Sequence, residues 1–394
     1  MKLLHVVPSY LPAWRYGGPI GAIHSLCAEL VRAGHEVTVY TTDADGPQRL
    51  DVPSDRAVLL DGVRVHYFPR ATPWRLYRAP ALAAAAHAHV REFDLVHLHS
   101  VFLWPTWAVA RAAEQAQTPW ILSPRGMLVR ELVRARGRLR KSLWLRAFER
   151  RTLERAAAVH ATSALEAERL AEFDFELPAI ECVPNGVERY PDTPPAPDNA
   201  ALRRRATGRT RLLYLGRLSW KKRTHELLEA VAELPELELV IAGPDDEGLR
   251  PGLERRAAEL DCAERTQLVG EVHGADKQHL LGSSDALVLA SHSENFGNVV
   301  LEAMAAGTPA LVGSEVGAAE LVQRAGCGLC IDGAQLGAGL RSFLALSSEA
   351  RGSMGARGRA YARRELGWDA VALEMARAYE RALGLPSTAA RRAA

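Results

Sequence analysis

The sequence predicts an α/β protein made of two doubly wound domains of similar size. Short apolar runs alternate with amphipathic segments, and this alternation occurs twice, before and after a proline-rich segment. Strands that alternate with helices pair in parallel, so each half is expected to form one sheet with helices on both faces. The length of 394 residues is about twice that of a usual domain, and a composition of 48% hydrophobic and 24% charged residues is ordinary for packed globular cores.

The first domain, residues 1–190, is expected to contain seven strands. They lie at Leu3–Val7, Glu36–Thr42, Val63–Tyr67, Asp94–His99, Trp120–Ser123, Ala157–Ala161 and Ile180–Val183. After the first strand, Pro19–Val31 is expected to form a helix because its apolar residues share one helical face. Pro19 suits the first turn and Gly34 suits the C-terminal cap.

The second domain, residues 200–365, repeats the pattern after the segment Arg189–Asn199. Four prolines in that segment cannot continue a helix or a central strand, so we interpret it as the linker. Strands are expected at Arg211–Leu215, Leu237–Ala242, Thr266–Val269, Ala286–Ala290, Pro309–Val312 and Gly328–Ile331. Residues 366–394 follow. They contain one apolar helical face, formed by Trp368, Val371, Met375, Tyr379 and Leu383. This face must pack on another part of the chain.

Charge, cysteines and hydropathy exclude several classes of protein. The formal net charge of +2 favours no particular partner, and the five cysteines are odd in number, so they imply no disulfide framework. Cys327 and Cys330 have the spacing of a zinc or redox pair but lack a second pair, so we place them on a buried strand. The N-terminal apolar stretch is cut by Pro8 and is too short for a signal peptide, and no apolar run approaches membrane-spanning length. We expect a cytoplasmic protein, with peripheral contact at the inner face of the membrane left open.

Two loops are candidates for binding a phosphate, because ligands of open α/β sheets bind beyond the carboxyl ends of the strands. Gly17-Gly18 follow the first strand and open a helix, which suits either close approach to an anion or a simple tight turn. The loop Gly216–Arg223 carries four cations after a strand, which suits a diphosphate leaving group better than a solvated loop. Two such domains facing each other would leave a cleft between them.

The segment Ser291–Glu302 follows another strand and opens a helix. Gly297 and the amides of Asn298 and Val299 could form a phosphate nest. Glu294 would lie in the loop and Glu302 about one turn into the helix, where their charges would repel a phosphate. They fit hydrogen bonding to hydroxyl groups better, one on a sugar and one on a ribose. A strand followed by a capped surface helix is the alternative.

Together these residues resemble a known family. The spacing Glu294-x7-Glu302 with Phe296-Gly297, preceded by Gly216-Arg217 and Lys222, resembles retaining glycosyltransferases of the GT-B fold, family 4 or group 1. Further matches along the whole chain are Gly17-Gly18, Pro184-Asn185-Gly186-Val187 and Ala303–Pro309. The resemblance implies that the C-terminal helix crosses back to the N-terminal domain. It also implies transfer from a nucleotide sugar to a glycan or lipid-diphosphate acceptor with retention, without a cofactor or a metal, and a branch that acts on exopolysaccharide or lipopolysaccharide precursors.

The resemblance also assigns roles to residues. It implies that Arg217 and Lys222 contact the donor diphosphate, with Lys221 as a rival, that Glu294 contacts the transferred sugar, and that Glu302 binds the ribose. The turn Gly270-Glu271-Val272 is expected to hold the base. The donor-binding set is therefore Gly17, Gly18, Arg217, Lys221, Lys222, Val272, Glu294, Asn295, Phe296, Gly297, Asn298, Val299 and Glu302, of which Arg217, Lys222 and Glu294 are expected to be catalytic.

One departure concerns the acceptor side. Many relatives place a histidine at the end of a central N-terminal strand, whereas this chain has Arg125 in the stretch Ser123-Pro124-Arg125-Gly126. Arg125, together with His99 at another strand end, is therefore an acceptor-side candidate. Whether Arg125 replaces the histidine in function is left open.

Two patterns suggest metal sites and are set aside. Asp43-Ala44-Asp45 spells the DxD of metal-dependent transferases of the other major fold, but it follows the second strand of a Rossmann half, where a surface turn is expected. His97 and His99 share one face of a strand but lack an obvious third ligand.

The stretch Arg130–Arg155 is strongly basic, with ten cations against three glutamates and a local charge of +7. It is either a solvated helical face or a dock for anionic lipid or a lipid-diphosphate acceptor, with Trp144 and Phe148 inserted shallowly. No nucleic-acid motif accompanies it. The other functions considered are a sugar-binding protein without catalysis and a nucleotide-sugar epimerase of the same fold.

Overall fold

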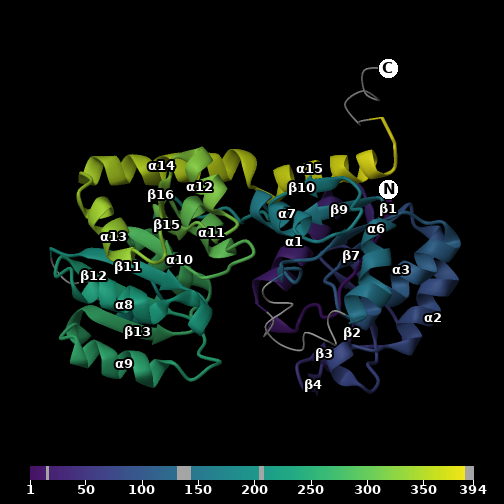
Figure 1. Ribbon diagram of the computed structural model, residues 1–394, viewed down its shortest axis with the longest axis horizontal. Coiled ribbons are helices and arrows are strands. Elements are labelled where there is room, and N and C mark those ends of the chain that lie inside the picture. The colour runs from purple at the N-terminus through teal and green to yellow at the C-terminus, as the bar shows by residue number, and fades with distance from the viewer. Residues whose placement is uncertain (15–16, 131–142, 204–207, 387–394) are drawn as a thin grey trace. The chain divides into compact units, whose positions relative to one another are not determined.

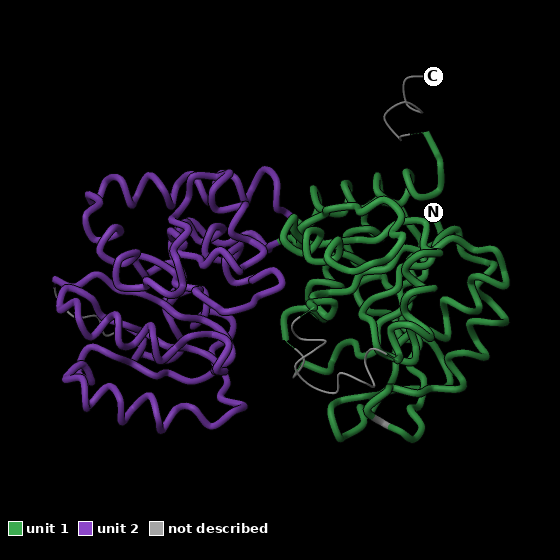
Figure 2. Tube along the Cα trace, in the orientation of Figure 1, with its two compact units in different colours: residues 1–186, 368–394 green, residues 187–367 purple. Residues whose placement is uncertain are grey.

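The computed structural model describes residues 1–14, 17–130, 143–203 and 208–386. The chain forms two compact units, shown in different colours in Figure 2. Unit 1 contains Met1–Gly186 and Trp368–Ala394, and unit 2 contains Val187–Gly367. Each is a Rossmann-like α/β unit with its own sheet, so the fold class predicted from the sequence is confirmed.

Unit 1 contains an eight-stranded sheet, of which Figure 1 labels β1, β2, β7, β9 and β10. The strand order is β10-β9-β8-β7-β1-β2-β6-β5, and only β5 is antiparallel to its neighbour. Its strands are β1 Lys2–Val6, β2 Glu36–Thr42, β5 Val58–Leu60, β6 Val63–Phe68, β7 Leu95–His99, β8 Trp120–Ser123, β9 Ala158–Ala161 and β10 Ile180–Cys182, and a small hairpin is formed by β3 Ala44–Asp45 and β4 Gln48–Arg49. The helices are α1 Gly18–Arg32, η2 Trp74–Leu76, α2 Pro80–His89, η3 Val90–Glu92, α3 Trp104–Ala116, the π-helical turn η4 Leu145–Glu149, α6 Arg150–Glu154, α7 Ala164–Ala171 and α15 Trp368–Ala382.

Both faces of this sheet are buried, as parallel strands require. Alternate residues of β1 enter different cores: Leu3 packs in the core that contains α1 and α15, and Leu4 packs in the core that contains α2 and α3. The seven strands predicted for this half are all present. The edge strand β5 and the β3–β4 hairpin were missed because each has only two or three residues.

Unit 2 contains a six-stranded parallel sheet in the order β13-β12-β11-β14-β15-β16. Its strands are β11 Thr210–Leu215, β12 Leu237–Ala242, β13 Thr266–Gly270, β14 Ala286–Leu289, β15 Ala310–Gly313 and β16 Gly328–Ile331. The helices are η5 Ala200–Arg203, η6 Trp220–Lys222, α8 Thr224–Ala232, α9 Arg250–Glu259, η7 Ala263–Arg265, α10 Gly274–Ser283, α11 Asn298–Ala306, α12 Ala319–Ala325, α13 Leu336–Leu344 and α14 Ser348–Glu365. All six predicted strands of this half are present.

The terminal helix α15 belongs to unit 1. It packs against α1, and the predicted apolar face, including Val371, Met375 and Tyr379, is buried in the same core as Leu3. Trp368, the first residue of α15, packs over Gly186, where an added Cβ would lie 2.5 Å from the indole ring. The chain therefore passes from unit 1 to unit 2 at residues 186–187 and returns at 367–368.

The interpretation of Arg189–Asn199 as a linker is wrong, because this segment packs along unit 2. Asp192 forms ion pairs with Arg359 at 3.1 Å and Arg363 at 2.5 Å. The carbonyl of Pro195 accepts a hydrogen bond from His279 at 3.0 Å, and the amide of Asn199 donates to Asp276. Prolines prevented regular structure here, as predicted, but side chains of unit 2 still hold the segment.

In the described part of the chain, no helix has both the length and the apolar character that a membrane crossing needs.

Candidate functional site

The strand order of unit 2 fixes where a ligand is expected. The chain winds outward in one direction from β11 through β12 and β13, and in the other direction from β14 through β15 and β16. β11 and β14 are neighbours, so the point where the strand order reverses lies between them, and ligands of such sheets bind beyond the carboxyl ends at this point. The two segments that the sequence singled out, Gly216–Arg223 and Ser291–Glu302, directly follow these two strands.

The loop after β11 begins with a close approach to β12. A Cβ atom at Gly243 would lie 1.9 Å from the carbonyl oxygen of Gly216, so only glycine fits there. The hydroxyl of Tyr214 donates a hydrogen bond of 2.7 Å to the carbonyl of Arg217 and fixes the backbone of that residue. The Arg217 guanidinium is about half exposed and pairs with Asp246 at 3.2 Å. Sequence reasoning missed Tyr214 because a tyrosine in a buried strand looks like ordinary core.

The structure brings Lys222 and Glu294 together. The Lys222 ammonium donates to the Glu294 carboxylate, and both side chains are only about one-fifth exposed. Lys221, the rival candidate, instead places its ammonium over the Trp220 ring, 5.8 Å from the centroid. The backbone amide of His292 donates to the carbonyl of Lys221 at 2.8 Å, so the two loops are also joined through their main chains.

Backbone hydrogen bonds hold the Glu294 loop. The amide of Glu294 donates to the carbonyl of Glu315, and the carbonyl of Glu294 accepts from the amide of Gly317. Phe296, predicted to bind the donor, is 4% exposed and packs in the core of unit 2, so it anchors the loop instead of facing a ligand. Gly297 then caps α11 with φ +90, a conformation that side chains rarely adopt.

The first turn of α11 contains Asn298 and Val299, and the helix direction makes this end favourable for an anion. Glu302 lies about one turn further and pairs with Lys277 of α10 at 2.7 Å. Lys277 was not predicted, because a single lysine on an amphipathic helix carries no signal in the sequence. Asn295 is partly exposed between Glu294 and Phe296.

The turn after β13 lies at the next strand but one from β11. Gly270 has φ +77 and its carbonyl accepts a 2.7 Å hydrogen bond from the amide of Gly243. The Val272 side chain is 9% exposed, whereas the neighbouring Glu271 and His273 are exposed and pair with each other at 3.3 Å. A nucleobase bound at this turn would therefore contact its backbone more than the buried Val272 side chain.

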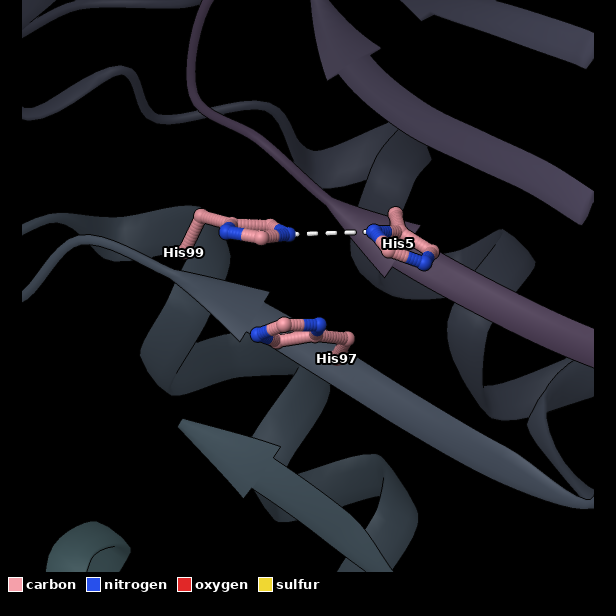
Figure 3. A group of neighbouring side chains, drawn as sticks. All are labelled: His5, His97 and His99. Atoms are coloured by element: carbon pink, nitrogen blue, oxygen red, sulfur yellow. Dashed lines mark hydrogen bonds between the residues drawn. The ribbon is translucent and has the colours of Figure 1, made fainter. Parts of the chain in front are cut away.

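Unit 1 has its own point of strand reversal, between β1 and β7. Gly17, with φ +73, precedes α1, which begins at Gly18. Three fully buried imidazoles lie on the two strands: His5 of β1, and His97 and His99 of β7. Figure 3 shows His5 and His99 meeting edge to edge, with 3.1 Å between Nδ1 and Nε2, while the His97 ring lies in a separate plane.

His5 is the third imidazole that the sequence could not supply, because it comes from a strand more than ninety residues away. The three rings nevertheless suit hydrogen bonding better than metal ligation. A metal lies in the plane of each imidazole that binds it, but the rings of His97 and His99 stack at 4.1 Å with an interplanar angle of 29°. The cationic Arg125 also approaches within 3.4 Å of His99 Nδ1.

Arg125 joins two motifs predicted separately. One nitrogen donates to Asn185 Oδ1 at 3.0 Å, in the Pro184-Asn185-Gly186 motif, and another approaches His99. Its backbone has φ +55 directly after β8. Among the described residues Arg125 has no carboxylate within ion-pair distance, and burial lowers its pKa, although the Glu166 charge opposes that shift.

The DxD pattern is not a surface turn. Asp43 is buried, and its carboxylate accepts the Arg70 amide at 2.9 Å and lies 3.4 Å from the Arg49 guanidinium. Ala44 and Asp45 form β3. The Cys327-x2-Cys330 pair is divided by burial, because Cys327 is buried and Cys330 is exposed on the edge strand β16. The expectation that both cysteines are buried is therefore wrong for Cys330.

Much of the stretch Arg130–Arg155 lies outside the described residues, including Arg134, Arg136, Arg138, Arg140 and Lys141. In the described part, Arg150 pairs with Glu154 at 2.8 Å and Arg151 with Glu114 at 2.8 Å. Trp144 and Phe148 pack on each other with ring centroids 4.7 Å apart, and Phe148 also contacts Trp107 of α3. Leu143 is a large apolar side chain that faces solvent here, with 70% of it exposed.

Comparison with known proteins gives the family. The pattern of a family described as glycosyl transferases group 1 matches residues 199–361, and that of a glycosyl transferase 4-like domain matches residues 17–186. A glycogen synthase from Mycobacterium tuberculosis is 30% identical over 375 residues, which cover 87% of this chain and 86% of that protein.

Solved structures agree with the fold. Sucrose-phosphate synthase from Thermosynechococcus elongatus superposes with a TM-score of 0.73 at 22% identity and covers 97% of this chain and 99% of that one. Anabaena Alr3699/HepE, solved in complex with UDP-glucose, superposes with a TM-score of 0.70 at 20% identity, with 96% and 99% covered. The chain has the GT-B fold and belongs to the group 1 glycosyltransferases.

Proposed function

We propose that this enzyme transfers a sugar from a nucleoside diphosphate sugar to a glycan or lipid-linked acceptor with retention of anomeric configuration and without a divalent metal. The observation that carries the proposal is the pairing of Lys222 with Glu294 beside Arg217 at the strand reversal of unit 2. UDP-glucose, with which HepE was solved in complex, belongs to this chemical class.

The charges suit the breaking of a glycosidic bond to a diphosphate. Negative charge grows on the leaving diphosphate, and preorganised cations stabilise that charge most in the transition state. Arg217, Lys222 and the N-terminus of α11 supply positive potential without a metal ion. Glu294, held in place by Lys222 and by its backbone hydrogen bonds, can accept hydrogen bonds from sugar hydroxyls.

We expect the acceptor on the side of unit 1, where His99 ends β7 and Arg125 lies just beyond β8. Retention is supported by the family resemblance, with a donor phosphate oxygen taking the acceptor proton in front-face attack. A role in cell-surface polysaccharide synthesis rests on the family resemblance, and peripheral contact with an anionic membrane rests on the basic stretch Arg130–Arg155.

A donor screen tests the proposal. Purified enzyme is incubated with uridine, guanosine, adenosine and thymidine diphosphate sugars, and the melting temperature is measured with each. A stabilising donor is then supplied with candidate acceptors, and the product mass is determined. The proposal expects one donor class to raise the melting temperature in the wild type and much less in Arg217→Ala.

Two outcomes contradict the proposal and identify its rivals. Conversion of the donor to an isomeric sugar without any acceptor would identify an epimerase. Stabilisation by a free sugar, together with none by any nucleotide, would identify a binding protein.

A further inference from the structure

A continuous chain of hydrogen bonds crosses the buried interior of unit 1. It runs over the adjacent strands β9, β8, β7 and β1 and includes one side chain from the terminal helix α15. We call it the histidine chain. Its members, from the carbonyl of Val183 to the guanidinium, are His160, Ser123, His97, Tyr379, His5, His99 and Arg125.

The direction of the bonds is fixed at the Val183 end. A carbonyl oxygen only accepts, so His160 donates from Nε2 at 2.9 Å, and its Nδ1 must then accept. The Ser123 hydroxyl therefore gives its single proton to His160 Nδ1 at 2.6 Å. With that proton used, the Ser123 oxygen accepts from His97 Nε2 at 2.7 Å. His97 Nδ1 is left as an acceptor, and it takes the proton of the Tyr379 hydroxyl at 2.7 Å.

The opposite end fixes the same direction independently. A guanidinium only donates, so His99 Nδ1 accepts from Arg125 at 3.4 Å and the His99 proton lies on Nε2. His99 Nε2 then donates to His5 Nδ1 at 3.1 Å, which leaves the His5 proton on Nε2. His5 Nε2 lies 3.5 Å from the Tyr379 oxygen, and this oxygen still has an acceptor position.

The bond directions set from the two ends agree at Tyr379. Its hydroxyl donates to His97 and accepts from His5, so all four imidazoles are neutral and carry their proton on Nε2. An extra proton on His5 Nδ1 or His99 Nδ1 would place a donor against a donor, and one on His97 or His160 would displace the proton of the Tyr379 or Ser123 hydroxyl from its hydrogen bond. Burial opposes such a proton as well: desolvation, followed by the Arg125 charge, lowers the pKa of His5 to about 3, and burial lowers the pKa of His160 to about 3 and those of His97 and His99 well below the ordinary value.

At the end opposite Val183, the histidine chain holds the Arg125 cation through acceptors that carry no charge. The Arg125 guanidinium donates to Asn185 Oδ1 and His99 Nδ1, and in the described part of the chain no carboxylate lies within ion-pair distance of it. The Arg125 Nε is buried and has no hydrogen-bond partner among the residues that the structure describes. The positive charge of a guanidinium held in this way is not offset, whereas a paired carboxylate would cancel it.

We propose that Tyr379 and Ser123 are positioning residues: through the histidine chain they fix four neutral Nε2–H imidazoles, which hold the Arg125 guanidinium at the carboxyl edge of β8 for the transfer reaction. The kinetic part of this inference rests on the proposed function, whereas the protonation pattern does not. The terminal helix α15 thus contributes the Tyr379 hydroxyl to the histidine chain of unit 1, as well as apolar packing.

Nitrogen-15 NMR of histidine-labelled full-length protein tests the pattern, because ring nitrogen shifts distinguish the two neutral tautomers and the cation. Substitution of each histidine by asparagine assigns the signals. At pH 7 the signals of His5, His97, His99 and His160 are expected to be those of neutral Nε2–H rings. An Nδ1–H or doubly protonated ring at any of the four overturns the chain. So does a shift of the His5, His97 and His99 signals on addition of equimolar zinc, which would establish a metal site in its place.

Tyr379→Phe tests the positioning role, with Tyr10→Phe as the matched control. Both tyrosines are fully buried, and Tyr10 bonds to His24 Nδ1 at 2.9 Å outside the chain. Tyr379→Phe is expected to move the His5 and His97 signals and to lower kcat about tenfold or more, as misplaced catalytic groups do, with the KM for donor unchanged. Tyr10→Phe is expected to move only the His24 signal.

A purely structural role for Tyr379 predicts a lower melting temperature with the kcat of the folded fraction unchanged, and that result overturns the proposal. If Tyr379→Phe does not fold, Ser123→Ala serves as the second variant, with the same loss of kcat expected and His97 and His160 as the reporting signals. If the wild type binds no nucleotide sugar, the proposed function fails while the NMR pattern still tests the chain.

Discussion

The Lys222 ammonium is bound to the Glu294 carboxylate across the strand reversal of unit 2, and the two residues follow neighbouring strands, β11 and β14. The pair accounts for a carboxylate beside the diphosphate site that we propose. Lys222 screens the negative charge of Glu294, and Glu294 fixes the position of a flexible lysine. A donor diphosphate would then approach a partly neutralised cation beside the unscreened end of α11.

Metal independence is the first prediction. In the proposed site, Arg217 and Lys222 supply the positive charge for the diphosphate, so no metal ion is needed there. The Asp43 carboxylate already accepts a hydrogen bond from the Arg70 amide and faces Arg49, so it does not call for a divalent ion either. Turnover is expected to be unchanged after dialysis against a chelator and unchanged on addition of manganese or magnesium. Activity that disappears in chelator and returns with either metal would instead support the Asp43/Asp45 site.

Retention of configuration is the second prediction. With the donor identified by the screen, the product linkage is examined by NMR soon after mixing, before any spontaneous equilibration of anomers. The anomeric configuration of the product is expected to match that of the donor. An inverted product would be incompatible with the retaining mechanism that the family resemblance implies.

The buried Glu149 gives the third prediction, which concerns stability. Burial raises its pKa from 4.5 to about 7, although hydrogen bonds from Trp144 and the Phe102 amide oppose the shift. Below pH 4.5 the carboxyl is protonated in folded and unfolded chains alike. Between pH 4.5 and 7 only the unfolded chain ionises, so the free energy of unfolding falls as pH rises through this window and is level above it.

Glu149→Gln keeps an oxygen to accept both hydrogen bonds and removes the ionisation. It is therefore expected to be more stable than the wild type at pH 8, by about 2–3 kcal/mol, with little difference at pH 4.5. Denaturant unfolding at the two pH values measures this. Glu154→Gln is the control: it removes a carboxylate that pairs with Arg150, so no gain in stability is expected from it. Equal stability of Glu149→Gln and wild type at pH 8 would contradict the account.

The fold could be predicted from the sequence because both sheets consist almost entirely of parallel strands with apolar runs. Such runs can be recognised as strands without knowing which strand each one pairs with. Lys222 and Glu294 could be placed in the loops after two of these strands, and their roles in donor binding stay predictions. Lys277, Tyr214 and Tyr379 could not be found in this way. Each looks like an ordinary helix-surface or core residue. Lys277 and Tyr379 act through contacts with residues distant in the chain, Glu302 and His97. Tyr214 acts through a hydrogen bond to the nearby carbonyl of Arg217, and a tyrosine in a buried strand gives no sign of such a bond.

The packing of Arg189–Asn199 shows a second limit. Proline content predicts the absence of helix and central strand but not the absence of tertiary contacts. Asp192 is held by two arginines of α14, more than 160 residues away, and no local pattern encodes those ion pairs.

Membrane contact is the fourth prediction. Each Lys or Arg near an anionic surface contributes about 1 kcal/mol, so partial engagement of the stretch Arg130–Arg155 is enough to retain the protein. The enzyme should sediment with vesicles that contain phosphatidylglycerol at low salt and be released at high salt, because the attraction is screened. Arg138, Arg140 and Lys141, which lie outside the described residues, are changed to Glu in the test variant. The same substitutions at Arg255, Arg256 and Arg357 of unit 2 form the control, and undiminished binding by the test variant would reduce the stretch to a solvated surface.

The fifth prediction tests the central claim, that donor transfer depends on the cations at the strand reversal of unit 2. The measurement is kcat/KM for the identified donor in Arg217→Ala and Lys222→Ala, with Arg256→Ala on the exposed face of α9 as the control. Loss of a preorganised group that stabilises developing charge typically lowers the rate about a hundredfold or more. We predict a fall of that size in each of the two site variants, with melting temperatures near that of the wild type and full activity in the control. Near-normal kcat/KM in both Arg217→Ala and Lys222→Ala would contradict the assigned site.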